Sequence, residues 1–265
     1  GTLTVNGGVL RMFQSGLSNF MLSLSGNGTL KLIDGATLTS NTGASMVLNG
    51  DGTLQVYDSG ISDSVNITAD GRSNLVFDNA QIGPSVDCPP DSRATVTAVN
   101  TTFVDGWDKF GGHAVAYLTD VAMPFIGAAD DATIYIYSWM SVTVWDGSGQ
   151  PGGINHVLPG ATVDAIYPND GIVPDIFPHP HSGMTDGDGK VLFQVLRTKL
   201  TQDNIVNMGS MFIRASYTYG GQSYYDDFYR GEADRYTAVS QGGYYVGDSL
   251  ARGVFSASLN ISSAK

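Results

Sequence analysis

The phrase Gly-Thr-Leu recurs in the first half of the chain and limits what that half can fold into. It stands at Gly1-Thr2-Leu3, Gly28-Thr29-Leu30 and Gly52-Thr53-Leu54. Weaker copies lie at 74–79, 94–100, 115–120 and 132–137. The anchors are Leu3, Leu30, Leu54, Leu75 and Val96, at intervals, by subtraction of residue numbers, of 27, 24, 21 and 21. A fixed period of roughly 20–50 residues indicates a protein built of stacked repeats.

Inside each copy the hydrophobic period is two. Leu30 and Leu32 in one copy, and Leu54 and Val56 in the next, alternate with polar residues, as in a half-buried strand. Asp-Gly, Asp-Ser and Asn-Gly then turn the chain, because these residues tolerate turn geometry. The pattern resembles a right-handed parallel β-helix over roughly 1–137. A leucine-rich repeat is disfavoured, since the asparagine ladder and a helical half-repeat are missing.

The composition favours an all-β chain. Glycine accounts for 34 of 265 residues, and Glu232 is the single glutamate. Residues that favour helices are scarce, whereas Thr, Val, Ser, Tyr and Asn abound. The length suits one large or two ordinary domains.

The pattern changes near Ser138, so we predict a β-helix domain at 1–138 and a second domain at 139–265. The second part resembles an immunoglobulin-like or carboxypeptidase-regulatory-like β-sandwich. The matching residues are Val142, Val144, Asp146, Gly149, Pro151, Pro159–Val163, Thr185, Asp186, Gly189, Val191 and Phe193. A hairpin is predicted at Phe212–Tyr219 and Gln222–Tyr229, and a last strand at Gly253–Ile261. The long segments Tyr167–Met184 and Asp227–Asp248 depart from the family pattern.

Charge excludes some partners. The net charge is −12 and no basic stripe is present, so a nucleic-acid partner is not expected. No apolar run of about 20 residues could span a bilayer. An acidic surface suits a secreted or wall-associated protein that has calcium as its candidate ion, and solubility alone is the alternative. The single cysteine, Cys88, is interpreted as a buried filler, with an intermolecular thiol link as the alternative.

Several side chains are candidate modification or metal sites. The N-x-S/T sequons are at Asn27, Asn66, Asn100 and Asn260, and Asn66 and Asn100 are preferred for glycosylation. Asp186 and Asp188 resemble the front of a calcium loop, but the downstream Glu is missing and a β-turn is favoured. His179 and His181 would share one side of an extended segment and could bind a transition metal with Asp175. A polar loop is favoured there.

Catalysis is not favoured, although β-helices often belong to polysaccharide lyases and hydrolases. We expect Asp34, Asp58 and Asp78 to stack in one column, which is what a recurring turn requires. The basic residues of the first half show no cluster in the sequence; they are Arg11, Lys31, Arg72, Arg93 and Lys109. No catalytic or cofactor-binding residue is therefore predicted.

A β-helix followed by a β-sandwich is similar to cell-surface proteins of archaea and bacteria. We expect a structural subunit of an extracellular assembly, such as an S-layer, sheath or filament, that polymerises with its own copies. Other cell-envelope proteins or glycans are further candidate partners. The repeat begins at Gly1 without a leader or cap, which predicts an exported, processed chain whose open coil a neighbour covers, and a trimmed chain is the alternative. Lateral contacts are expected from Tyr224, Tyr225, Tyr229, Tyr236, Tyr244 and Tyr245. The alternatives are a polysaccharide-active enzyme or carbohydrate-binding adhesin that uses the β-helix groove, and a phage or pilus-tip fibre.

Overall fold

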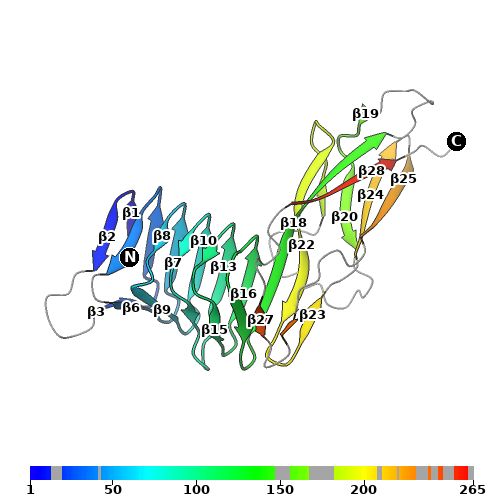
Figure 1. Cartoon of the computed structure of the whole chain (residues 1–265). Coiled ribbons are helices and arrows are strands. Elements are labelled where there is room, and N and C mark those ends of the chain that lie inside the picture. The colour runs from blue at the N-terminus through cyan, green and yellow to red at the C-terminus, as the bar shows by residue number, and fades with distance from the viewer. Residues whose placement is uncertain are drawn as a thin grey trace. The chain divides into compact units, whose positions relative to one another are not determined.

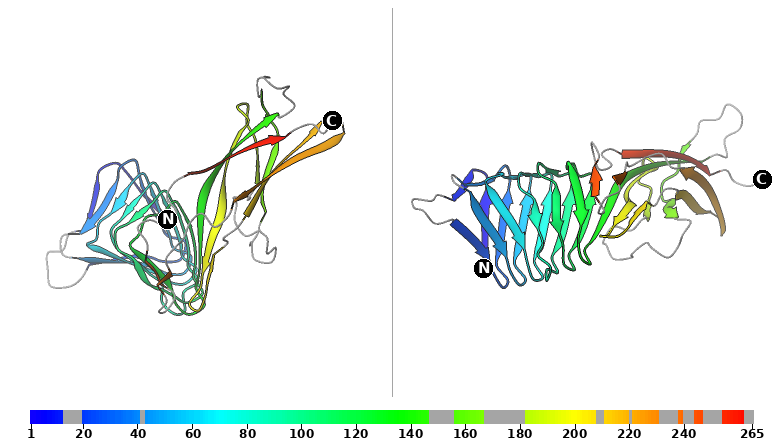
Figure 2. Two further views of the ribbon diagram at one scale, coloured as in Figure 1. Left: turned by 45° about the vertical axis from the view of Figure 1, so that its right-hand side comes forward. Right: turned by 60° about the horizontal axis from the view of Figure 1, so that its bottom comes forward.

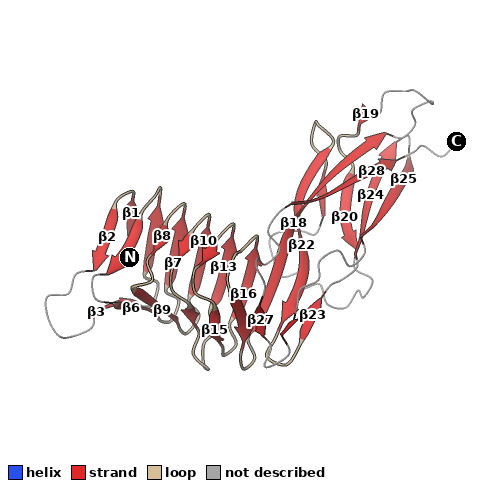
Figure 3. Cartoon of the chain, viewed as in Figure 1, coloured by secondary structure: helices blue, strands red, loops and turns tan. Residues whose placement is uncertain are grey.

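A computed structural model describes residues 1–12, 20–40, 43–146, 156–166, 182–207, 211–219, 221–230, 238–239, 244–246 and 254–261. These residues form strands and turns without a helix (Figure 3). Accordingly, they include no helix that is long and apolar enough to cross a membrane. The all-β prediction is confirmed. The candidates His179, His181 and Tyr236 lie outside the described residues.

The first half is a β-solenoid of about five turns, as predicted (Figure 1). Its longest sheet, sheet A, takes one strand from each coil, and these strands run side by side (Figure 2). They are β1 (Thr2–Asn6), β4 (Thr29–Ile33), β7 (Thr53–Tyr57), β10 (Asn74–Asp78), β13 (Thr95–Val99) and β16 (Val115–Thr119). The sheet continues with β18 (Thr133–Asp146), β22 (Lys190–Leu200) and β23 (Ile205–Asn207).

Two further parallel sheets close each coil. Sheet B consists of β2 (Val9–Met12), β5 (Thr37–Ser40), β8 (Gly60–Ile61), β11 (Gln81–Ile82) and β14 (Thr102–Phe103). Sheet C consists of β3 (Phe20–Leu24), β6 (Ala44–Leu48), β9 (Val65–Ala69) and β12 (Val86–Asp87). A fourth sheet has the strand order β15 (Trp107–Phe110), β17 (Phe125–Ala128), β27 (Tyr244–Val246) and β26 (Ala238–Val239).

The repeat anchors are stacked in register. Leu3 is opposite Leu30, Leu30 opposite Leu54, Leu54 opposite Leu75, and Leu75 opposite Val96. The intervals between them are unequal, yet the strands keep their pairing. The alignment read from the Gly-Thr-Leu phrases is therefore confirmed at every anchor.

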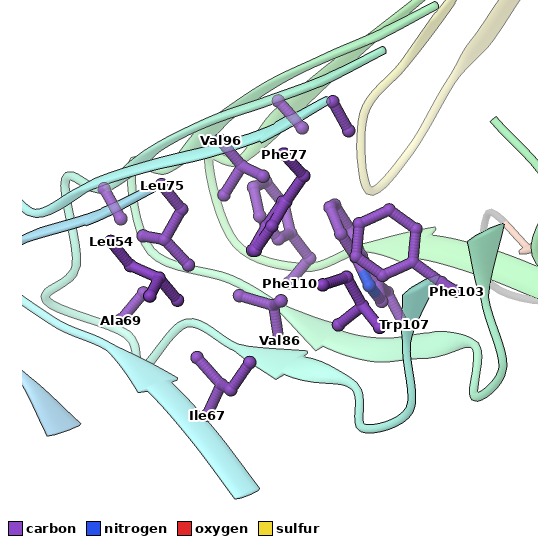
Figure 4. Packing of buried hydrophobic residues seen from close by; sticks show 14 of the residues in the cluster. Leu54, Ile67, Ala69, Leu75, Phe77, Val86, Val96, Phe103, Trp107 and Phe110 are labelled. Carbon is purple, nitrogen blue, oxygen red and sulfur yellow. The ribbon is translucent and has the colours of Figure 1, made fainter. Parts of the chain in front are cut away.

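The side chains that point inward form one continuous core. The anchors from Leu30 onward are at most 1% exposed. An aromatic group fills the later coils: the ring centroids of Phe77 and Phe103 are 5.6 Å apart, and those of Phe103 and Trp107 are 4.8 Å apart (Figure 4). Trp107 and Phe110 stack at 5.0 Å. The middle coils thus pack against the coils on both sides of them.

Contacts divide the chain into two compact units. Unit 1 comprises Gly1–Ile136, Thr198–Val206 and Tyr236–Arg252, and unit 2 comprises Tyr137–Arg197, Asn207–Arg235 and Gly253–Lys265. Strands β18 and β22 contribute residues to both units. The boundary at residue 138 remains a prediction.

Unit 2 contains an antiparallel sheet in the order β21 (Ser182–Met184), β20 (Thr162–Ile166), β24 (Met211–Tyr219) and β25 (Gln222–Arg230). The predicted hairpin is confirmed, because β24 and β25 pair from Met211 and Arg230 to Tyr219 and Gln222. The predicted last strand is β28 (Val254–Ile261), which runs parallel to β18. The short β19 (His156–Val157) is antiparallel to the end of β18.

Candidate functional site

The first coil presents an apolar face that no described strand covers. Its inward side chains come from all three sheets, and each stands in register with a fully buried residue of the second coil. We call this set the end face; its residues are Leu3, Val5, Leu10, Leu22 and Leu24. Leu3 is 52% exposed, whereas its partner Leu30 is 1% exposed. The other four are partly buried against the core.

The same coil also supplies the edge strand of each sheet. Among the described strands, β1, β2 and β3 each pair on one side only. Their outer edges therefore carry backbone N–H and C=O groups that a further strand could pair with. Native edges are commonly protected by lysine or proline, and β1 and β3 contain neither. The end face thus combines apolar side chains with unprotected strand edges.

A column of left-handed turn residues follows sheet A. Each member comes directly after a sheet A strand and has φ between +48° and +54°; they are Asp34, Asp58, Asn79, Asn100 and Asp120. Asp and Asn reach this conformation more readily than other residues that carry a Cβ. The Nδ2 of Asn79 donates to the Oδ1 of Asp58 at 2.7 Å. The column is therefore a structural feature: each of its residues forms the turn that follows a sheet A strand, once per coil.

The predicted column of Asp34, Asp58 and Asp78 is wrong in its last member. Asp78 lies on β10 in register with Tyr57, and Asn79 occupies the turn position instead. Counting four residues on from each anchor would have found Asn79. Burial, followed by the charge of Asp58, raises the pKa of the Asp78 carboxyl, and a hydrogen bond from the Asn79 backbone partly opposes this. Asp78 is thus disfavoured in its charged form.

A second column is basic and lies at the opposite ends of the sheet A strands, just before each strand begins. Arg72, Arg93 and His113 each stand two residues before a sheet A strand, and those strands pair in register. All three side chains are exposed. No basic cluster is visible in the sequence, because residues 21 and 20 positions apart meet only when the coils are stacked. Counting three residues back from Leu75, Val96 and Ala116 would have found them.

Glycines fix the turns that carry this basic column. Gly71 has φ +62°, and a Cβ there would come within 2.7 Å of the backbone of Gly50 in the preceding coil. Gly112 has φ +66°, and a Cβ there would meet the Pro89 oxygen at 2.6 Å. Only glycine combines this conformation with so close an approach. The backbones beneath Arg72 and His113 are therefore tightly stacked.

The acidic metal candidates form a tight turn. The Asp186 Oδ1 accepts the backbone N–H groups of Asp188 and Lys190, both at 2.9 Å. The Lys190 oxygen accepts the Asp186 N–H at 2.8 Å, which closes the loop before β22. Within the described parts of the chain, no three His, Cys, Asp or Glu side chains are grouped so that they could hold a metal ion.

The four sequons have different settings. Asn27 is exposed in the turn before β4, and Asn100 is exposed in the left-handed column. Asn66 is exposed on the outer face of β9, where its neighbours Val65 and Ile67 point into the core. Asn260 lies on β28, where its backbone is in register with Trp145.

Cys88 is inside the solenoid. Its side chain is 4% exposed, and burial raises the pKa of its thiol to about 12. A hydrogen bond with Ser92 lowers this value only in part. Because the thiolate is the reactive form, the native thiol is expected to be inert.

No protein-family model matches the chain, and no curated protein or solved structure matches it significantly. Its function is therefore inferred from its own residues.

Proposed function

We propose that this protein is a structural subunit of an extracellular assembly, and that its end face binds the end face of a second copy. The observation that carries the proposal is the exposed apolar ring on the first coil, in register with a buried ring one coil further in. An apolar coil face in a solenoid is stabilised when a neighbour covers it, because each repeat contacts only the adjacent repeats. A second copy would cover this face and its strand edges together.

The strands of the first coil carry little charge, which supports a second copy as the partner of the end face. The chain has a net charge of −12, so the rest of its surface repels another copy. Neither β1 nor β3 contains a charged residue, and β2 contains only Arg11. Two end faces related by a twofold axis would place their edge strands antiparallel, which is a favourable pairing. Burying a side chain such as Leu3 is worth roughly 1.5–3 kcal/mol.

Growth of a layer or filament requires a second contact, because a twofold contact alone closes a dimer. Large apolar side chains are exposed on unit 2; they are Met184, Leu192 and Tyr225. Tyr225 is 67% exposed, and the Arg214 guanidinium lies over its ring at 5.1 Å. Tyrosine packs well at partly hydrated interfaces, so we assign the second contact to this part of unit 2.

An extracellular location is part of this proposal. Its support is the acidic surface and the four sequons, three of which are exposed in the described residues. The immunoglobulin-like arrangement of unit 2 and the similarity to archaeal and bacterial surface proteins belong to the same proposal. Other envelope proteins or glycans would be its further partners.

The test is self-association of matched variants. Leu3→Asp places a charge on the end face, whereas Met21→Asp places one on the first coil outside the end face. Met21 is 63% exposed, in register with Ser45 on the outer side of sheet C. Light scattering and electron microscopy of the full chain should show dimers or larger assemblies for the wild type and Met21→Asp, and monomers for Leu3→Asp. A monomeric wild type at high concentration, or equal loss in both variants, would contradict the proposal.

A further inference from the structure

We infer that the basic column of Arg72, Arg93 and His113 is a binding site for a carboxylate-bearing polysaccharide. Successive coils of a parallel solenoid lie about 4.8 Å apart, so these side chains start from neighbouring rungs. Their register follows from the pairing of Asn74 with Thr95 and of Thr95 with Val115. The site is thus a short row of basic side chains at the starts of three neighbouring sheet A strands.

The backbone holds this row in place. The N–H of Arg72 donates to the Gly50 oxygen at 2.7 Å, and that of Arg93 to the Gly71 oxygen at 2.6 Å. The N–H of His113 donates to the Ser92 oxygen at 2.7 Å. Each basic residue is therefore tied to the coil before it. The bases of the three side chains are fixed, and the charged ends are exposed to solvent.

Within the described residues, neither Arg72 nor Arg93 forms an ion pair through its guanidinium group, while His113 Nδ1 lies 3.3 Å from Asp131 Oδ2. Like charges that stand in register on adjacent coils repel each other. None of the described carboxylates lies within ion-pair distance of these two arginines. An external anion would offset the repulsion.

The surrounding acids define where the anion binds. Asp51 and Asp131 occupy the positions that correspond to Arg72 in the coils at the two ends of the column. Asp70 is engaged locally, because its Oδ1 accepts the Gly71 N–H at 2.6 Å. Asp91 lies next to Ser92, two residues before Arg93, and is exposed. The attractive part of the site is therefore the pair Arg72 and Arg93, with His113 extending it.

The chemistry of the site favours carboxylates at regular intervals. Arginine presents a planar fork that binds a carboxylate through two parallel hydrogen bonds. A polymer of uronic acids carries one carboxylate on each sugar, so neighbouring arginines can bind successive or alternate units. A double-stranded nucleic acid carries one negative charge per about 1.7 Å of its axis, so the net charge of −12 opposes it more strongly than a polymer with a single charge on each sugar. This site differs from the end face and does not depend on self-association.

The experiment uses the full chain and a galacturonic acid hexamer, with a neutral glucose hexamer and dextran sulfate as comparison ligands. Isothermal titration and NMR should show binding to the uronate hexamer that weakens with salt. The double variant R72Q/R93Q should bind about tenfold or more weakly, since each substitution removes a charge-assisted hydrogen bond to a carboxylate. The matched control is Lys31→Gln, which removes a positive charge elsewhere on sheet A, where Lys31 Nζ lies 5.3 Å from the Tyr57 ring centroid. It should bind as the wild type does.

Circular dichroism establishes that each variant is folded. The inference is overturned if the wild type does not bind the uronate hexamer, or if it binds the glucose hexamer or dextran sulfate more tightly. Equal weakening by Lys31→Gln and R72Q/R93Q would also overturn it, because net charge alone would then explain binding. Repeating the titration with Leu3→Asp separates this site from self-association, since that variant should retain full affinity.

Discussion

The first coil and the middle coils of the solenoid have the same sequence phrase but different surroundings. Leu3, Leu54 and Leu75 belong to one column of sheet A, in register through Leu30. Leu54 and Leu75 are completely buried between coils, whereas Leu3 is half exposed. The phrase therefore specifies the strand and its inward residue, and the neighbouring coils determine how much that residue stabilises the fold.

The largest expected effect contrasts these two positions directly. Leu75→Ala should lower the free energy of unfolding by about 2–5 kcal/mol, because it opens a cavity between packed coils. Leu3→Ala in the monomer should cost less than about 1 kcal/mol, since much of that side chain is already in water. Urea unfolding followed by circular dichroism measures both. Equal losses would show that the first coil is as well packed as the middle ones.

A smaller effect is expected in the turns. Asp58→Ala should destabilise the solenoid by about 1 kcal/mol, because alanine is strained at φ +48° and the bond from Asn79 Nδ2 is lost. Asp58→Gly removes the same bond but accepts the left-handed conformation, so it serves as the control. Thermal unfolding should place Asp58→Gly between the wild type and Asp58→Ala. If the alanine variant were at least as stable as the glycine variant, the conformational explanation would fail.

The smallest effect concerns Asp78 and changes with pH. The raised pKa of Asp78 means that the folded state favours the protonated carboxyl, so its stabilising contribution is present at low pH and is lost as the pH rises through the folded pKa. Asp78→Asn should therefore stabilise the protein at pH 7. This gain should disappear below about pH 4, near the unfolded pKa of aspartate.

Melting temperatures from pH 3 to pH 8 would measure this difference. Combining Asp78→Asn with Asp58→Asn makes the test of ionisation more specific, because the charge of Asp58 contributes to the raised pKa of Asp78. The gain from Asp78→Asn should be smaller when Asp58 is already neutral. A gain that was the same at pH 3 and pH 7 would point to packing and not to ionisation.

The accuracy of the sequence predictions followed the strength of the repeat. The strand anchors were correctly aligned, because period-two alternation and the Gly-Thr-Leu phrase are visible in the amino-acid sequence. Asp78 was misplaced by one residue, since Asp78 and Asn79 are both good turn formers and only the backbone distinguishes them. The hairpin of β24 and β25 was predicted from its glycines.

The sequence by itself determined the solenoid: its strands, its register and the polar turns, because each follows from short-range alternation and from residues that accept left-handed backbone. Only the tertiary structure decided what the surface can bind. Arg72 and Arg93 are 21 positions apart in the chain, yet stacking places them on adjacent coils. Leu3 and Leu30 end the same Gly-Thr-Leu phrase, yet only Leu30 is covered by described coils on both sides. Proximity between coils and burial between neighbours are properties of the stacked molecule, so no local pattern contains them.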